Sequence, residues 1–439
     1  LMKKAFIIAG LASIVAANAS ALSLKDGLDI VFDENPNLQT VKSDVKIKEE
    51  LKSQAVSGFM PDVEATYSLQ DQNINAEGSP SVDSSPSTGG VTLTQNLFTG
   101  GATLAGFKAA KYNEQAALSN YNSQQQKIFK NATQAYLTVM TAEEVFEFNK
   151  RQVATNTEEM KRIKQRFELG DITLPNLKEF EARLSGYIAD KENAHGNLLA
   201  AKSAFATVFG RTANELTWPT ISPNLPSDLD ETLQISRENN PDIIKAKLDL
   251  KASKEGINVA KASFMPTVAA VASWNNNSNA YGATDTNVTT IGVQASIPLF
   301  KGGENASKYS QSKLEKMQAE DALRQRIREI EATSSNAYND VLVQIQRVKA
   351  LKIRLDSFEI TQDATEKQEE AGEASVIDVL DARDDKFSAQ VDLQIAKQEL
   401  VLAKFDLLAS IGKFTYADMS DIFTATEVVK NEPIEDEMI

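Results

Sequence analysis

Two aspartates in the segment GEASVIDVLDARDD, at 372–385, are the residues of this sequence best placed to do chemistry. Asp378 and Asp381 are three positions apart, so on a helix their carboxylates lie on one face. If several copies of the chain gather this segment around a narrow mouth, the carboxylates would favour cations, disfavour anions and offer a divalent metal a place to bind and block. A second interpretation stays open, because Ser375 followed by Asp378 is also the pattern of a helix N-cap with an acidic third residue.

Enzymatic chemistry finds little support in the composition. The single histidine, His195, stands in a run of helix-forming residues, where a helix-surface position is far more common than the role of a base or metal ligand. The sequence has no cysteine for a nucleophile or a zinc cluster. The TGG and KGG motifs lack the spaced glycines and the Lys-Ser/Thr of a phosphate-binding loop. We therefore expect no enzymatic activity and no cofactor.

The N-terminal residues have the pattern of a secretory signal. Lys3 and Lys4 precede the apolar stretch Ala5–Ala16, which is too short to cross a bilayer as a helix and is followed by small residues. We predict a signal peptide over 1–21 and export from the cytoplasm. The net charge of −15 argues against nucleic acid as a partner, because nucleic-acid-binding proteins need a basic face.

Several short motifs occur twice in the sequence with a constant spacing along the chain. LFTGG at 97–101 returns as LFKGG at 299–303, and Ala135-Tyr136 returns as Ala337-Tyr338, each 202 residues later. A repeat of this length is a duplicated half-protein rather than a solenoid unit. The predicted organisation is a first repeat at 22–216, a Pro-containing linker at 217–228, a second repeat at 229–415 and an acidic C-terminal tail at 416–439, of which we expect 427–439 to be disordered.

Most of each repeat is predicted to be helical. The stretch 304–368 contains no Pro and no Gly, and a helix over it would be about 97 Å long. Eleven positions follow one another through this stretch in alternating steps of four and three residues. Nine of the eleven are apolar, which is the pattern of a coiled-coil seam. The eleven positions are 323, 327, 330, 334, 337, 341, 344, 348, 351, 355 and 358. The matching long helix is predicted at 102–166. Shorter helices are predicted at 23–56, 176–208, 228–262 and 377–411.

Four segments alternate apolar and polar residues with period two, which is typical of strands with one apolar face. They lie at about 59–72, 89–98, 265–275 and 288–299, and polar loops at 73–88 and 275–287 join the members of each pair. Strands of about ten residues suit a transmembrane barrel. A soluble hairpin packed on the helices would show the same alternation, but the export signal and the long helices favour the membrane.

Proline and glycine separate the helices from the strands. Pro61 and Pro266 stop a helix and start a strand, because Pro cannot donate to a helix interior and favours extended neighbours. The pairs Gly100-Gly101 and Gly302-Gly303 let the chain turn sharply where a strand becomes a helix.

Four strands cannot close a barrel, and an open sheet edge in lipid leaves backbone groups without partners. The chain must therefore pool strands with copies of itself. Two copies would give a barrel of eight strands, and its own side chains would fill the interior. Three copies would give twelve strands, enough for a water-filled lumen. We predict a homotrimer whose long helices leave the membrane as a tube of paired coils.

The order and spacing of these motifs resemble the TolC-like outer-membrane efflux protein family across nearly the whole chain after the signal. The motifs that carry the resemblance are NP at 35–36 and 240–241, FMP at 59–61 and 264–266, LFTGG, LFKGG, RFELGDITLPNLKEFEARL at 166–184 and AGEASVIDVLDARDD at 371–385. The family implies a mixed α/β membrane protein, in which four strands per chain build a trimeric twelve-stranded barrel that continues as a helical periplasmic tunnel. It also implies a periplasmic adaptor and an inner-membrane transporter, of RND or ABC type, as partners.

The resemblance also bears on the acidic segment. TolC-like channels carry acidic residues at positions matching Asp378 and Asp381, which favours a periplasmic gate there. This sequence departs from the family at Asn176, where an Asp is common, and at Glu369 and Ala374, where well-known members have a Tyr and an Arg that tie the closed tip together. We therefore expect the interactions that hold the tip closed in this chain to differ from those of the well-known members.

The leading hypothesis is a passive duct in the outer membrane, with a long periplasmic part, for export of small molecules or proteins. The alternative is an exported coiled-coil structural or adhesive protein without a pore, whose apolar strand faces would be covered by protein rather than lipid. Cargo, transporter class and adaptor identity leave no readable trace in the sequence.

Overall fold

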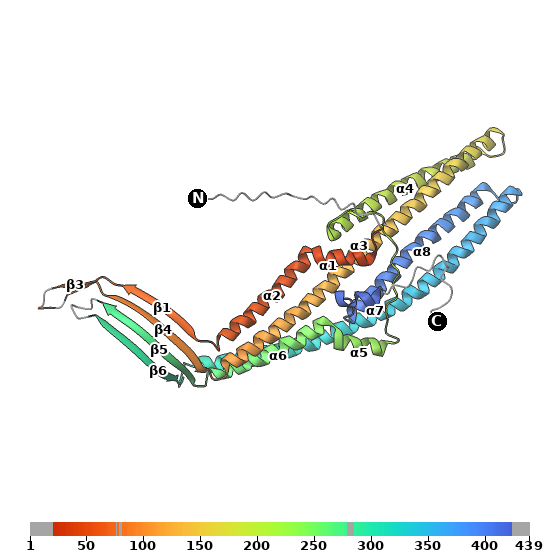
Figure 1. Cartoon of the computed structure of the whole chain (residues 1–439). Coiled ribbons are helices and arrows are strands. Elements are labelled where there is room, and N and C mark those ends of the chain that lie inside the picture. The colour runs from red at the N-terminus through yellow and green to blue at the C-terminus, as the bar shows by residue number, and fades with distance from the viewer. Residues whose placement is uncertain (1–20, 76, 79–80, 279–284, 424–439) are drawn as a thin grey trace, which may run out of the picture.

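The structure is a computed structural model that describes residues 21–75, 77–78, 81–278 and 285–423. Residues 1–20 of the predicted signal peptide and the tail after residue 423 fall outside these residues. The molecule is elongated, with a β-sheet at one end, helices along its length and two helical hairpins at the far end (Figure 1). The helices are α1 Leu24–Glu34, α2 Pro36–Ser57, α3 Ala102–Glu168, α4 Leu174–Phe209, α5 Leu229–Asn239, α6 Pro241–Ala262, α7 Glu304–Glu370, α8 Val376–Ser410 and α9 Met419–Ile422.

The single helices predicted over 23–56 and 228–262 are wrong, because each breaks at its Asn-Pro pair. The Asn35 side-chain oxygen accepts hydrogen bonds from the backbone amides of Asn37 and Leu38, and Asn240 does the same for Asp242 and Ile243. Proline fits the first position of a helix, where its missing amide has no partner to lose. Each Asn-Pro pair therefore ends one helix and starts another.

The two long helices, α3 and α7, have 67 residues each, which is about 100 Å of helix. All eleven positions of the seam predicted in α7 are buried or partly buried within this one chain. The same stripe therefore packs against the helices beside α7, which are α8, α6 and the short α5.

The helices form one layer, a wall, whose order follows from their contacts. On one side α3 packs against α4 and α2, and on the other side against α8 and α6. α7 packs on the far side of α8 and α6, so that α7 lies at one edge of the wall and α2 with α4 lie at the other. α8 ends where α6 begins, and Asn240 Nδ2 donates a 2.8 Å hydrogen bond to the carbonyl oxygen of Ser410 across this joint.

The sheet is antiparallel and has the strand order β1-β4-β5-β6. Its strands are β1 Asp62–Leu69, β4 Ser87–Phe98, β5 Thr267–Ser278 and β6 Thr286–Ser296. β6 ends before Pro298 rather than at residue 299, because proline has no amide for the ladder. The loop predicted at 73–88 is partly wrong, since it contains two short paired strands, β2 Gln72–Ile74 and β3 Val82–Ser84.

The crossings from helix to strand and back use the predicted residues. Pro61 and Pro266 each lie directly before a strand. Gly101 and Gly303 are the N-caps of α3 and α7, with φ of +89° and +86°. At Gly100, φ is +65°, and an added Cβ would lie 2.6 Å from the Cβ of Met265, so that any other residue would be both strained and crowded.

The largest core lies midway along the wall and joins α1, α3, α4, α8 and α9. It corrects the predicted start of the tail at 416. Tyr416–Asp418 form a 3₁₀ turn that leads into α9, where Met419 and Ile422 are buried in this core. The apolar side chains among the acidic residues explain why this part packs.

The hydroxyl of Tyr136 ties two chain segments to this core. It lies 2.7 Å from the carbonyl oxygen of Leu22 and 2.6 Å from that of Thr217, and it accepts a 3.0 Å hydrogen bond from the Thr217 amide. The matching Tyr338 makes one longer hydrogen bond, 3.3 Å, to the carbonyl oxygen of Ser227.

We expect Tyr136→Phe to lower the free energy of unfolding by about 1 kcal/mol, because it removes the part-buried hydroxyl that bonds to the carbonyl oxygens of Leu22 and Thr217. Tyr338→Phe is the matched control and should cost less. Thermal unfolding in detergent, followed by circular dichroism, compares the two variants. Equal midpoints, or a larger loss for Tyr338→Phe, would contradict the role assigned to Tyr136.

Candidate functional site

The acidic segment lies at the end of the molecule farthest from the sheet, where α7 turns into α8 (Figure 1). Asp378 sits in the first turn of α8 and forms a capping box with Ser375. Its carboxylate accepts a 2.7 Å hydrogen bond from the Ser375 amide, and its own amide donates to the Ser375 hydroxyl at 3.2 Å. These hydrogen bonds lower the pKa of Asp378, so that its exposed carboxylate stays ionised.

Asp381 is held by a cation. Arg183 on α4 places Nη1 2.6 Å from the Asp381 carboxylate and Nη2 3.0 Å from that of Glu179. The two aspartates that share a face are therefore not equivalent: Asp378 is an exposed anion, and Asp381 is one half of an ion pair. Arg183 was missed in the sequence because 198 residues separate it from Asp381.

Asp384, one turn after Asp381, is the centre of a half-buried polar cluster. It accepts hydrogen bonds from the Tyr187 hydroxyl at 2.7 Å and from Gln152 Nε2 at 3.1 Å, and Arg183 Nη1 lies 3.5 Å away. Burial raises the pKa of Asp384 and outweighs the hydrogen bond from Tyr187. The cluster joins α3, α4 and α8, and so links the two hairpins.

Two further ion pairs link the hairpins near their ends. Arg166 on α3 lies 2.6 Å from the carboxylate of Glu369 on α7. Arg383 on α8 lies 3.7 Å from Glu159 on α3, and within its own hairpin it lies 2.8 Å from Glu366 on α7. Glu369 is one of the positions where the sequence departs from the TolC-like pattern, and its partner here belongs to the same chain.

The third predicted gate residue, Asn176, is not joined to the aspartates. It lies in the first turn of α4, where its backbone amide is 3.5 Å from the capping hydroxyl of Thr173. Across the described part of the chain, no three Asp, Glu or His side chains come together in a way that could hold a metal ion. The ring of His195 lies 5.2 Å from that of Phe146, centre to centre.

The sheet offers a different kind of surface. Its register places apolar side chains in rows across neighbouring strands, such as Val63 opposite Leu93 and Ala272 opposite Ile291. The other face carries mostly polar residues, among them Asp62 opposite Thr94 and Ser273 opposite Thr290. Because this one-sidedness extends over all four strands, one face suits lipid and the other suits water.

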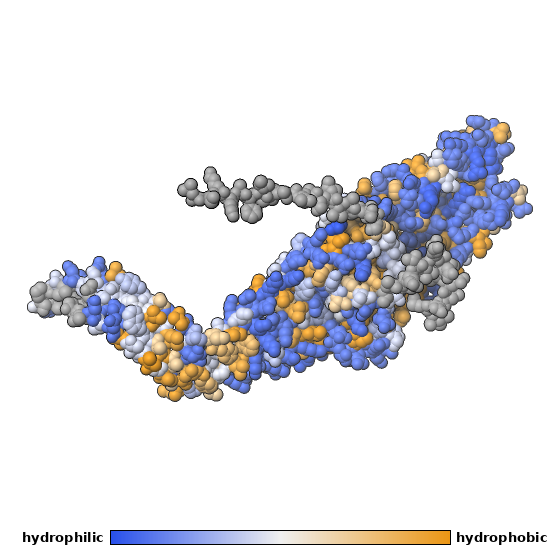
Figure 2. All heavy atoms as spheres, viewed as in Figure 1, coloured by the Kyte–Doolittle hydropathy of each residue, from blue (hydrophilic) through white to orange (hydrophobic). Residues whose placement is uncertain are grey.

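Exposed apolar side chains also gather where the sheet meets the helices. They are Phe59, Met60, Leu97, Phe98, Phe264, Met265, Leu299 and Phe300, and they come from the FMP and LF motifs of both halves. Figure 2 shows the apolar surface around this junction, in contrast to the hydrophilic surface of the hairpin ends. Large aromatic and apolar groups are typical of the boundary between a membrane and water. Over the residues described here, no helix is both long enough and apolar enough to cross a membrane.

We expect Arg183→Gln to loosen the hairpin ends, because it leaves Asp381 and half-buried Asp384 without their cation. The free energy of local opening should fall by about 1 kcal/mol, which corresponds to roughly fivefold faster amide exchange in the first turns of α4 and α8. Hydrogen exchange measured by mass spectrometry tests this. Lys178→Gln is the control, since the ion pair of Lys178 within the described chain is with Glu181 on its own helix. Equal exchange in both variants would contradict the assignment.

Comparison with known proteins agrees with this architecture. The family model described as "Outer membrane efflux protein" matches the chain twice, over residues 28–211 and 232–413. The chain is 24% identical to the outer membrane efflux protein BepC of Brucella suis, over 92% of this chain and 89% of that protein. It is 22% identical to the outer membrane protein TolC of Vibrio cholerae, over 91% and 92% of the two chains.

Solved structures show the same fold. The crystal structure of a membrane protein from Pseudomonas aeruginosa superposes with a TM-score of 0.78 at 20% identity, covering 89% of this chain and 93% of that one. The predicted resemblance to the TolC-like family is thereby confirmed. The chain belongs to the outer membrane efflux protein family and is a protein of the outer membrane.

Proposed function

We propose that the chain is one third of a homotrimeric outer-membrane duct, which carries small molecules or proteins passively to the exterior. In this proposal a twelve-stranded barrel continues into a helical periplasmic tunnel. An adaptor protein joins the tunnel to an inner-membrane transporter, which supplies the energy. The observation that carries the proposal is that, over the described residues, both the sheet and the helical wall end in an unpaired edge on each side.

The first pair of edges belongs to the sheet. β1 and β6 are its outer strands, and each pairs with one neighbour only. In lipid, the free amide and carbonyl groups of such an edge have no water to bind, so that the sheet has to close. Pairing β6 of one copy with β1 of the next satisfies both edges. Three copies give twelve strands, whereas two would give a barrel of eight filled by its own side chains.

The second pair of edges belongs to the helical wall. In α7, Val343, Ile353 and Ile360 each stand two positions after a seam residue, which is about 200° around the helix, so they face away from the chain's own helices. Ile353 and Ile360 are 60% and 72% exposed. Leu314, Met317 and Leu342 are also exposed on α7. These six residues form a second apolar stripe, which no other described part of the chain covers.

The opposite edge of the wall also exposes apolar residues. These are Ile47 and Leu51 on α2, and Ile188 and Leu199 on α4. Since β1 follows α2 and β6 precedes α7, docking the α7 edge on the α2/α4 edge also brings β6 beside β1. Such head-to-tail contacts close into a ring when the rotation allows it.

Internal duplication is part of the proposal. Each half runs through two helices broken at Asn-Pro, a strand pair, a helix of 67 residues and a second hairpin helix, in the same order. The family model matches each half separately. Tyr136 and Tyr338, 202 positions apart, both bond to backbone carbonyls near the start of their half. Duplication supports a ring built from six similar halves, two from each of the three copies.

The hairpin ends would form the periplasmic mouth of the tunnel. Three copies would bring three exposed Asp378 carboxylates together, while Asp381 contributes less charge because Arg183 neutralises it. Cations should therefore be favoured at the mouth, and a divalent cation could bind among the Asp378 carboxylates and block it. Asn176 would line the same mouth without charge.

The trimer proposal predicts that charges on the α7 stripe prevent assembly. We expect Ile353→Glu with Ile360→Glu to shift the protein from trimer to monomer in mild detergent, because the carboxylates would be buried at the contact. Mass determination by light scattering measures this. Leu118→Glu, at a 52% exposed position in the middle of the wall on α3, is the control and should remain trimeric. An unchanged trimer in the double variant would exclude this edge as the interface.

The duct proposal predicts discrete, cation-preferring conductance when the purified protein is inserted in a planar bilayer. Asp378→Asn should reduce the cation preference and the block by divalent metal added at the hairpin side. Asp381→Asn should have a smaller effect, because its carboxylate is already paired. If both variants keep the selectivity of the unchanged protein, the charged mouth is excluded. The absence of channels even after the hairpin links are removed by Arg166→Gln and Arg183→Gln would favour a structural coiled-coil protein.

A further inference from the structure

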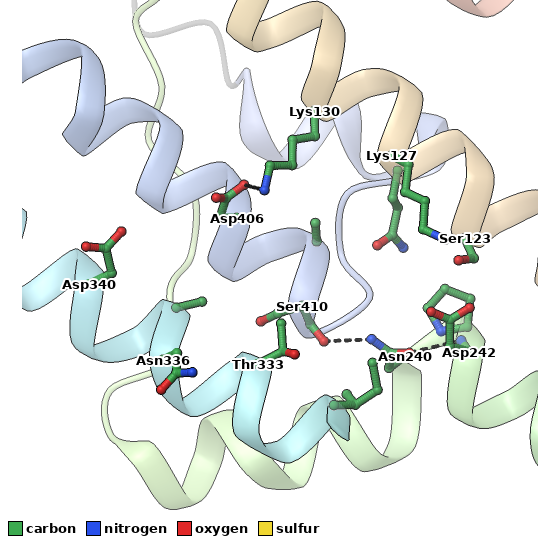
Figure 3. Close-up of a pocket in the computed structure, with 15 residues that line it drawn as sticks. Ser123, Lys127, Lys130, Asn240, Asp242, Thr333, Asn336, Asp340, Asp406 and Ser410 are labelled. Atoms are coloured by element: carbon green, nitrogen blue, oxygen red, sulfur yellow. Dashed lines mark hydrogen bonds and ion pairs between the residues drawn. The ribbon is translucent and has the colours of Figure 1, made fainter. Parts of the chain in front are cut away.

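A cavity of about 670 Å³ opens at the joint where α8 ends and α6 begins, between α3 and α7 (Figure 3). Its volume lies in the range of pockets that hold small molecules, about 300–1,000 Å³. The apolar part of its lining comes from Pro241, Ile330, Ala337 and Ala409. This part of the wall lies between two helices of the same chain, and so away from the edges at which copies would meet.

The α3 side of the cavity presents hydrogen-bond donors. Ser123, Gln126 and Lys127 are spaced by three and four residues and line the cavity together. Ser123 and Gln126 are each only 4% exposed, and the buried Gln126 Nε2 has no hydrogen-bond partner among the described residues. Lys127 forms no ion pair within the described chain. A buried donor without an acceptor costs about 1–3 kcal/mol, which a bound acceptor would recover.

The α7 side presents acceptors. Asp340 and Asn336 lie one turn apart there, and among the described residues Asp340 accepts a single hydrogen bond, of 3.3 Å, from Gln344. The remaining cation, Lys130, is already engaged 2.8 Å from the Asp406 carboxylate. Figure 3 shows Lys127 and Ser123 on the side of Asp242, with Asp340 and Asn336 across the cavity on α7. The cavity thus has donors on α3 with the Asp242 carboxylate on the same side, acceptors on α7, and an apolar part made by Pro241, Ile330, Ala337 and Ala409.

We propose that this cavity binds a small zwitterionic amphipathic molecule. Its carboxylate accepts from Gln126, Ser123 and Lys127, its ammonium group donates to Asp340, and its apolar body covers Pro241, Ile330 and Ala409. A ligand there contacts α3, α6, α7 and α8 at once and therefore stabilises the packing that forms the cavity. This assignment does not rest on the duct, since it concerns one chain and its own helices.

Binding is measured with the purified full-length protein in detergent, with ciprofloxacin as the probe, because it carries a carboxylate, an ammonium group and a fluorescent aromatic body. We expect saturable binding of one probe per chain by fluorescence anisotropy. Lys127→Gln and Asp340→Asn should each weaken binding about tenfold, because each removes a charge-assisted contact. Lys111→Gln changes a lysine of α3 outside the cavity and should leave the affinity unchanged.

Two further measurements distinguish binding in this cavity from binding elsewhere on the protein. The methyl ester of the probe, which keeps only the cation, should bind about tenfold more weakly to the unchanged protein and lose nothing more in Lys127→Gln. Gln126→Leu should fold, because it keeps the volume of the side chain. It should also weaken binding of the probe, because it removes the buried amide. Equal affinity in Lys127→Gln, Asp340→Asn and Lys111→Gln would overturn the proposal. Binding that appears only in a chain ending at Phe423 would also overturn it, and would assign the cavity to residues 424–439.

Discussion

A helix about 100 Å long is stable in water only if its apolar stripe is covered from end to end, and α3 and α7 both impose this constraint. No other described helix exceeds 36 residues, so each long helix is covered by two shorter ones placed end to end. Where two such helices meet, the last carbonyls of one and the first amides of the other need partners. Asn240 serves both: its Oδ1 caps α6, and its Nδ2 donates to Ser410 at the end of α8.

This joint explains where the rest of the core is. A gap between the two helices that meet end to end would expose the seam of α7. The short helices α1, α5 and α9 pack at this same level of the molecule. Tyr136 and Tyr338 bond the chain segments there to the long helices. The cavity of about 670 Å³ lies at the same place, because two helix ends cannot fill space as fully as a continuous helix does.

The parts of this structure that can be predicted from the sequence are those governed by local period and by backbone restriction. The α7 seam follows from apolar spacing alone, and all of its positions are buried or partly buried. Pro and Gly mark the helix–strand crossings because few residues tolerate the backbone there. Pro36 and Pro241 obey the same restriction as Pro61, but the apolar periodicity continues across them and hides the two helix breaks.

The rest depends on partners far away in the sequence. Polar residues at 73–88 show no alternation that would reveal β2 and β3, whose pairing is a matter of cross-strand bonds. The hydrophobic residues of α9 are hidden in an acidic context. Arg183 has no local signal at all, since its three carboxylate partners include two from the other half of the chain. Long-range electrostatics of this kind can be described only when the helices are placed side by side.

The two interpretations of the acidic segment are compatible. A capping carboxylate is held in its ionised form by the amide and hydroxyl that it contacts, and in Asp378 these contacts lower the pKa without burying the group. Capping therefore preserves the negative charge that a cation-selective mouth would need. Asp381 is the opposite case, because its charge is neutralised by the ion pair with Arg183 that joins α4 to α8. Of two aspartates on one helix face, one keeps its charge for solvent and the other uses it to hold the hairpins together.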